Sequence, residues 1–475
     1  MNQFIESILS NLGSAMILAA VVALLMAGGV WLHDRKRGSK ANWKRLILWM
    51  LLAGYLSVLV YATLLRGGGD FGHVNLRLFM AWREAWNHFS VRNWGNVLLN
   101  IALFIPLGVL VPLLFPKCRG ARMIFVVIGT TLLIECAQLF VGFSVFDVDD
   151  LFTNTLGGLM GWCLVMAVLS AKGRKWFAGI GYFLLAMIPV AAVGGIFAAY
   201  ALQPYGNLPE NYSYRLDTKN VAWVLDCDLS QHQETAAVYK APSMTQDECD
   251  ARAERMAECW GGEYDDIYYY DEDFYYRDYD TGGWIYYLNM SRLDGTFNLW
   301  SQEKEYDYFD SDEEEIWADL SRAETEALLD NYGITIPAEA EFLGLVQRYL
   351  GFADEKSIAF SADKLKIEGG LLDGECHVQV TKDGQYVNLD NLLVTYTYHA
   401  DEPIRTPEEA LKLLKDGCFG NSWRYTGKLS GQYNIETCTL SYALDTKGFY
   451  QPIYYFEVTA SDWNGPATIL IPAIA

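Results

Sequence analysis

The sequence lacks the short motifs that mark the common soluble enzyme classes. It contains no CxxC, HExxH or GxSxG, and its six histidines are scattered without a paired spacing. A thiol redox enzyme, a zinc hydrolase and a serine hydrolase therefore have no support in the sequence. We expect no cofactor, and no residue can be assigned a catalytic role.

An excess of basic residues is also missing. The 475 residues include 36 Lys and Arg against 58 Asp and Glu, for a net charge of −22, which argues against a nucleic-acid partner. The charge is unevenly divided. Residues 1–202 are very apolar and carry 16 basic and 8 acidic residues, whereas residues 203–475 have a net charge of −30. This division predicts a membrane domain over 1–202 and an acidic, tyrosine-rich domain outside the membrane over 203–475.

Six apolar runs in the first part are long enough to cross about 30 Å of hydrocarbon. They lie near residues 15–32, 46–65, 96–115, 123–141, 152–169 and 177–202. The first run has no Lys or Arg before it, which argues against a cleavable signal peptide. The predicted fold is therefore a polytopic α-helical membrane bundle of six transmembrane helices, followed by a C-terminal extracellular α+β domain.

Basic residues in short loops predict the orientation. Twelve of the sixteen basic residues of residues 1–202 fall in the loops after the first, third and fifth runs. Such loops remain cytoplasmic, so we expect the N-terminus and residues 203–475 to lie outside. The first outer loop contains NLRLFMAWREAWNHF, with apolar residues at helical spacing. This segment predicts an amphipathic helix that either lies in the outer interface or packs on the bundle.

Polar residues in the membrane runs are expected to converge near the outer surface. Ionisable groups are costly in hydrocarbon, so Glu135 is a candidate functional residue. By helix rise and chain direction, the polar groups of three runs should share one depth. The candidate ligand-binding residues are Asn96, Asn100, Glu135, Gln138, Asp147, Asp149, Asp150 and Asn154.

The same residues have structural interpretations. Asp149 or Asp150 could cap the fifth span, and the amides could join helices. Gly157 and Gly161 form a small-xxx-small pair that indicates close helix packing. If the site holds a metal, the three aspartates of the loop before the fifth span, Asp147, Asp149 and Asp150, are the candidate ligands.

Three strings in this part resemble the signatures of the VanZ-like family. They are NVLLNIALFIPLG, from Asn96, and the pair ECAQLF and DVDDLFTNTLGGLMG, from Glu135 and Asp147. The resemblance covers residues 45–170. One departure is Ser144, where the family usually has an arginine. The resemblance implies a plasma-membrane protein of the Gram-positive cell envelope, linked to teicoplanin-type antibiotic resistance, and it supplies no reaction.

The second part predicts helices packed on antiparallel sheet. SRAETEALLDNYG and TPEEALKLLKDG each begin with a capping-box pattern and end at glycine. In the stretch 261–310, aromatic residues alternate with charged ones, as they do in an antiparallel sheet with one face exposed to solvent. Asp271–Asp280 lacks the glycine and terminal glutamate of an EF-hand loop. The pattern allows two units, 203–318 and 319–475, and it resembles cystatin/PepSY-like modules.

Six cysteines fall in this part, an even number that suggests disulfides in an exported domain. They are Cys227, Cys249, Cys259, Cys376, Cys418 and Cys438. Cys418 with Cys438 is the favoured pair, and Cys227 could join Cys249 or Cys259.

The sequence favours a cell-envelope membrane protein that engages a lipid-linked or glycopeptide ligand at the outer leaflet. The expected partners are the lipid bilayer and a lipid-linked cell-wall precursor, peptidoglycan or a glycopeptide. Two alternatives stay open. One is a metal-dependent enzyme acting on a lipid-linked precursor, and the other is a membrane-anchored extracellular binding or sensor module.

Overall fold

The computed structural model contains two compact units. One comprises Met1–Trp86 and Val91–Pro204, the helical unit, and the other comprises Asn87–Ser90 and Tyr205–Ala475, the sheet unit. The structure describes residues 2–36, 42–65, 74–141, 146–208, 216–229, 233–260, 263–268, 274–280, 284–303, 318–349, 354–380, 387–419, 428–460 and 467–474.

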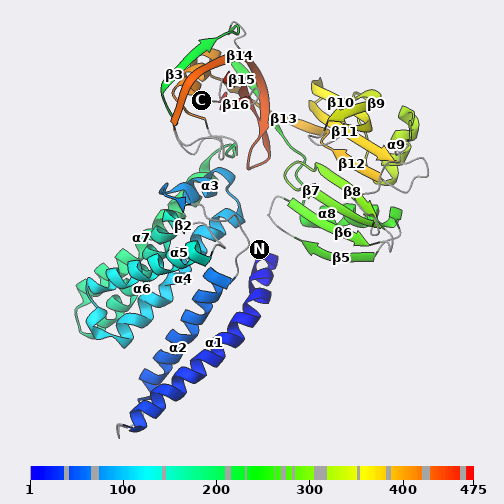
Figure 1. The fold of residues 1–475 in the computed structure, drawn as a ribbon. Coiled ribbons are helices and arrows are strands. Elements are labelled where there is room, and N and C mark those ends of the chain that lie inside the picture. The colour runs from blue at the N-terminus through cyan, green and yellow to red at the C-terminus, as the bar shows by residue number, and fades with distance from the viewer. Residues whose placement is uncertain are drawn as a thin grey trace. The chain divides into compact units, whose positions relative to one another are not determined.

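The helical unit consists of seven α-helices in the described residues, shown in Figure 1. They are α1 (Asn2–Lys36), α2 (Trp43–Val60), α3 (Met80–His88), α4 (Val91–Leu114), α5 (Arg122–Val141), α6 (Val148–Lys172) and α7 (Trp176–Leu202). A π-helical turn, η1 (Tyr61–Leu65), extends α2. Two short strands, β1 (Val74–Asn75) and β2 (Phe146–Asp147), pair in parallel.

Five of these helices are long and apolar enough to cross a membrane. They span Trp43–Thr63, Val91–Leu114, Arg122–Leu139, Val148–Lys172 and Trp176–Leu202. Large apolar side chains lie on their outer faces, such as Phe125, Leu133 and Phe177. Such faces are suited to lipid rather than water. The first expected run, 15–32, lies within α1, which is not among the five, so a six-span bundle remains a prediction.

The closest packing in the helical unit joins α4 and α6 through glycines. A Cβ atom at Gly108, Gly157 or Gly161 would lie less than 3.0 Å from backbone atoms of the facing helix. Only glycine therefore allows this approach, and the expected close packing at Gly157 and Gly161 is confirmed. Behind them, Gly158 faces the side chain of Val127 from α5.

Gly157→Ala is expected to destabilise the helical unit. Because the added methyl group would overlap the backbone at Ile101, the two helices must separate, at a cost of about 1–3 kcal/mol. Thermal unfolding of the purified protein in detergent measures the loss. Gly129→Ala is the matched control, because a Cβ there meets no atom within 4 Å. Equal midpoints for both variants would contradict the packing account.

The sheet unit is built on fourteen strands of the described residues, paired as one sheet. The order is β3-β14-β15-β4-β13-β11-β12-β8-β7-β6-β5, with β16 beside β15 and β10 between β11 and β9. The strands are β3 (Asp217–Leu225), β4 (Thr235–Lys240), β5 (Glu263–Tyr268), β6 (Phe274–Asp280), β7 (Trp284–Ser291), β8 (Phe297–Glu303), β9 (Glu341–Tyr349), β10 (Asp354–Ile367), β11 (Gly370–Val380), β12 (Val387–Asn391), β13 (Val394–Pro403), β14 (Lys428–Leu444), β15 (Phe449–Ala460) and β16 (Ala467–Pro472).

Three helices of the described residues accompany this sheet, and the sequence predicts the last two of them. They are α8 (Gln246–Trp260), α9 (Arg322–Asn331) and α10 (Pro407–Lys415). Capping boxes begin α9 at Ser321 and α10 at Thr406, which confirms both expected helix starts. The tyrosine-rich stretch forms the antiparallel strands β5 to β8. Phe274–Asp280 is strand β6, whereas residues 271–273 lie outside the described residues.

The two largest hydrophobic cores of the described residues lie against the sheet. The first draws its buried residues from positions 249 to 393. The second uses positions 216 to 236 and 404 to 473. The first core therefore crosses the boundary of the expected subunits 203–318 and 319–475, because β12 joins β8 in the sheet.

The buried tyrosines of the sheet unit link its stability to alkaline pH. The ring of Tyr450 stacks on Tyr396 with centroids 4.1 Å apart, and its hydroxyl donates to Asp373 at 2.5 Å. Burial, followed by this hydrogen bond, raises the pKa of Tyr450, and burial raises the pKa of Tyr442 to about 12. An unfolded tyrosine ionises near pH 10.

Above about pH 10 the folded state thus binds more protons than the unfolded state, so the free energy of unfolding should fall as pH rises. Tyr450→Phe should reduce that slope. Denaturant unfolding of the full chain in detergent between pH 7 and 12 measures it. At pH 7, the difference in the free energy of unfolding between wild type and Tyr450→Phe reports the loss of the hydrogen bond to Asp373. An unchanged slope in the variant would refute the assignment.

Candidate functional site

The expected polar residues converge at one place in the helical unit, beside the β1–β2 bridge. Asn75 pairs with Asp147 in this bridge, which brings the segment before α3 against the start of α6. The side chains that meet here come from α4, α5, α6 and the loop that precedes α3. We call the set Asn75, Asn100, Glu135, Asp147, Asp149 and Asp150 the polar cluster.

Asp149 binds the beginning of α3. Its side chain is 1% exposed, and its carboxylate accepts hydrogen bonds from the backbone N–H groups of Phe79 and, at 2.7 Å, Ala81. Phe79 has a φ of 67°, a left-handed conformation that is uncommon for a non-glycine residue. Since the free N–H groups of a helix start favour an anion, Asp149 holds this turn in place.

Asp147 is the cap of α6. Its Oδ1 accepts from the Asp149 N–H at 2.8 Å, and its Oδ2 accepts from Asn75 Nδ2 at 3.1 Å. Burial raises the pKa of Asp147, and the two hydrogen bonds only partly oppose that effect. The expectation that Asp149 or Asp150 caps this helix is wrong, because Asp147 precedes them in the extended conformation that a cap requires.

Two further contacts join α4 and α5 to the cluster. Asn100 Nδ2 donates to Asp150 Oδ1 at 2.5 Å, which links α4 to α6. Glu135 is 1% exposed, and its Oε2 accepts from the Asp147 N–H at 3.2 Å. Asn96 is exposed instead, so the structure does not bring it into this buried network.

Gln138 and Asn154 join other helices nearby. Gln138 Nε2 donates to the carbonyl oxygen of Thr63 in η1 at 3.0 Å. Asn154 Nδ2 donates to Thr131 Oγ1 at 3.0 Å and is 4% exposed. The amide oxygens of both side chains are buried without a hydrogen-bond partner among the described residues. Each oxygen could therefore accept a hydrogen bond from a ligand or a water molecule.

The aspartates do not form a metal site. Within the residues that the structure describes, no group of three or more His, Cys, Asp or Glu side chains could hold a metal ion. The carboxylates of Asp147, Asp149 and Asp150 instead accept hydrogen bonds from different donors on separate elements. The candidate metal ligands are thus not arranged as a shared set, because each serves a different helix or loop.

Aromatic rings pack α3 onto the bundle. Phe79 lies edge-on to Phe152 with centroids 5.2 Å apart, and Trp82 lies edge-on to Trp94 at 6.1 Å. Trp86 contacts Tyr200 of α7 at 6.2 Å. The helix expected in NLRLFMAWREAWNHF is therefore present and packs on the bundle, while its depth in a membrane remains a prediction.

The described cysteines are free in this structure, which places the two members of the favoured pair, Cys418 and Cys438, far apart. Cys418 lies near the start of β3, because the carbonyl of the preceding Gly417 accepts a hydrogen bond from the Leu216 N–H. Cys438 lies near the other end of β3, beyond Ile435, which pairs with Leu225. The nine residues of β3 separate these places by roughly 30 Å, far more than the ~7 Å that a disulfide allows between Cα atoms. Cys249 lies in the first core and Cys227 against the second. The side chain of Cys259 lies outside the described residues.

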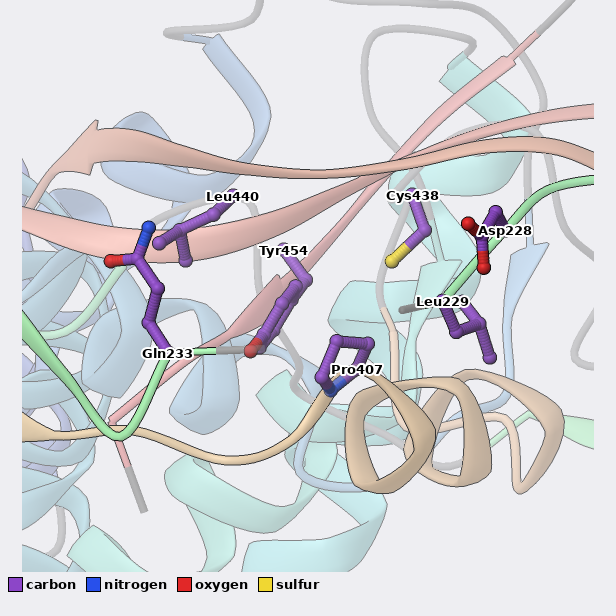
Figure 2. A pocket seen from close by; sticks show the side chains of 7 residues that line it. All are labelled: Asp228, Leu229, Gln233, Pro407, Cys438, Leu440 and Tyr454. Carbon is purple, nitrogen blue, oxygen red and sulfur yellow. The ribbon is translucent and has the colours of Figure 1, made fainter. Parts of the chain in front are cut away.

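A pocket in the sheet unit was not expected from the sequence. It is lined by Asp228, Leu229, Gln233, Pro407, Cys438, Leu440 and Tyr454, shown in Figure 2. The lining comes from the loop after β3, the start of α10 and two neighbouring strands. No local motif marks it, since residues distant in the sequence form it only after the sheet has folded.

The histidines also form one contact that spacing does not reveal. Ser357 Oγ lies 2.9 Å from Nδ1 of His377, and Glu375 Oε2 lies 2.8 Å from Nε2. This resembles the relay of a nucleophile, a base and an orienting carboxylate. Ser357 is 4% exposed and lies within strand β10. The contact joins β10 to β11.

Residues 44–170 match the family model described as VanZ/LLP1. A search of curated proteins found no match. The matched residues include the whole polar cluster, Gln138, Asn154 and the glycine contact of α4 with α6. The chain thus carries a VanZ-like region among apolar, membrane-type helices, and the expected resemblance is confirmed.

Asp149→Asn should release the start of α3. An amide can replace at most one of the two carboxylate contacts, and each hydrogen bond to a charged group contributes about 1.5–3 kcal/mol. We therefore expect amide exchange in residues 74–88 to accelerate by roughly 10-fold or more, as measured by hydrogen-exchange mass spectrometry. Asp34→Asn, at the end of α1, is the control. Unchanged protection in the Asp149 variant would show that α3 is held by packing alone.

Proposed function

We propose that this is a multi-pass protein of the bacterial plasma membrane, with its N-terminus and sheet unit outside. It acts at the cell envelope and contributes to tolerance of teicoplanin-type glycopeptide antibiotics by engaging a lipid-linked or glycopeptide ligand at the outer leaflet. The observation that carries the proposal is the polar cluster within the VanZ-like region, with Glu135 and Asp149 buried, next to amide oxygens that have no described partner.

The distribution of charge along the helices supports an outward-facing cluster. A basic residue lies at the start of α5, Arg122, and another at the end of α6, Lys172. Glu135 and Asp147 lie toward the opposite helix ends, where the segment before α3 closes over them. Since basic ends remain cytoplasmic, the acidic ends should face outward.

The chemistry of the cluster favours a ligand that donates hydrogen bonds. Gln138 Oε1 and Asn154 Oδ1 are acceptors, and the nearby carboxylates of Asp147 and Asp150 would repel an anion. Hydroxyl and amide groups of a sugar–peptide head meet this requirement, whereas direct contact with a pyrophosphate does not. This is the class of group that a cell-wall precursor and a glycopeptide share.

Of the two alternatives, the metal-dependent enzyme receives less support, because the aspartate carboxylates are committed to separate hydrogen-bond donors. The extracellular binding or sensor module is favoured by one observation. The sheet unit contains the pocket of Figure 2, formed away from the polar cluster. In that case the helices would anchor the protein in the membrane, and the sheet unit would bind the ligand.

Susceptibility of a sensitive Gram-positive host tests the proposal. The wild-type chain should raise the inhibitory concentration of teicoplanin several-fold, and Gln138→Ala with Asn154→Ala should remove the increase. Asn96→Ala, an exposed amide of α4, is the matched control and should behave as wild type. A truncation after Leu202 distinguishes binding by the polar cluster from binding by the sheet unit. Loss only in the truncation would assign binding to the sheet unit, and no effect of wild type would refute the proposal. Membrane blots ensure equal expression.

A further inference from the structure

Two cysteines lie side by side where β3 leaves the sheet. β3 pairs in parallel with β14, and the last matched residues are Leu225 and Ile435. The Asp226 N–H then donates to the Ile435 carbonyl at 2.9 Å, so the strands are still adjacent one residue later. Cys227 follows immediately.

A bulge in β14 brings Cys438 into register. The pairing of β14 with β15 shifts by one residue between Ile435 and Thr437. Because the bulge adds one residue to β14, Cys438 occupies the position two steps beyond Ile435. Cys227 is two steps beyond Leu225, so the two cysteines occupy matching positions on strands about 4.8 Å apart.

The two side chains also point to the same face. Cys227 and Cys438 both pack against the second core, and both are half-buried. An earlier matched pair on this face, Trp223 and Tyr433, has ring centroids 5.4 Å apart, so side chains of β3 and β14 meet there. Burial, followed by the electrostatic effect of Cys227, raises the pKa of Cys438 to about 12.

We propose that Cys227 and Cys438 form a disulfide that ties β3 to β14. The bond forms by thiol–disulfide exchange with the disulfide of an exported oxidoreductase. One cysteine thiolate attacks that disulfide and releases one thiol, and the second cysteine then displaces the other. Both cysteine protons are transferred, two electrons pass to the oxidant, and the oxidant leaves as a dithiol. The inference rests on the proposed placement of the sheet unit outside the membrane.

The disulfide would form before the strands pair. In the folded unit, burial suppresses the thiolate of Cys438, whereas an unfolded cysteine has a pKa near 8.5. Once formed, the bond would secure the end of β3, which lies at the end of the sheet order. It would also fix one wall of the pocket, because Asp228 and Leu229 follow Cys227 directly and Cys438 lines the pocket itself, as Figure 2 shows.

Thiol mapping of the full chain tests this pairing. Membranes of a Gram-positive host are quenched in acid, alkylated and digested without reduction. The expected result is a linked peptide containing Cys227 and Cys438, with Cys418 recovered in alkylated form. Recovery of Cys227 and Cys438 as alkylated free thiols, or in another pairing, would overturn the proposal.

Unfolding of the purified chain provides the second measurement. Reduction should lower the unfolding temperature of the wild type by about 5–15 °C and leave Cys227→Ser with Cys438→Ser unchanged. Cys418→Ser should respond to reduction as wild type does, and an equal response in the double variant would contradict the disulfide. The placement is tested separately with a membrane-impermeant maleimide on Ser430→Cys, an exposed position of β14. Lack of labelling in intact cells would refute the proposed topology, whatever the thiol map shows.

Discussion

The helical unit depends on the need of buried carboxylates for hydrogen-bond donors. Asp149 is nearly inaccessible to solvent, so it must find partners within the protein. It finds them in the backbone N–H groups at the start of α3, which require an acceptor themselves. One interaction thus satisfies an acid and a helix end, and it fixes the start of α3 to the start of α6.

The other contacts follow from this arrangement. Asp147 caps α6 and, through its backbone, reaches Glu135 of α5, while Asp150 reaches Asn100 of α4. The contact between Asn100 and Asp150 requires the close approach of α4 and α6 at Gly157 and Gly161. The polar cluster and the small-residue contact are therefore two parts of one structure, since wider helix spacing would separate the hydrogen-bond partners. Both parts lie within the VanZ-like region.

The sequence predicted the elements and the approximate place of the site. Hydropathy located five membrane-type helices, helix rise brought Asn100, Glu135 and the aspartates to one level, and capping boxes marked Ser321 and Thr406. These features are local or periodic, and they can be recognised within a short window. The same reasoning placed Asn96 with Asn100, yet Asn96 is exposed, because the spacing i, i+4 does not distinguish a buried edge from an exposed one.

Contacts between residues far apart in the chain could not be predicted from the sequence. Asp147, rather than Asp149 or Asp150, caps α6, and Asp149 binds donors that lie about 70 residues earlier in the chain. The proximity of Cys438 to Cys227 rather than to Cys418 depends on a parallel pairing and on one bulge. Nothing in the spacing of these residues carries that information.

Direct binding to the purified full chain tests the central claim that the polar cluster engages a sugar–peptide ligand. Teicoplanin and a lipid-linked muropeptide precursor would each be titrated in detergent and followed by native mass spectrometry. We predict that one of them binds wild type and Asn96→Ala equally and binds Gln138→Ala with Asn154→Ala about tenfold or more weakly, which corresponds to about 1.4 kcal/mol or more. Equal affinity for all three proteins, or no binding to any, would contradict the account.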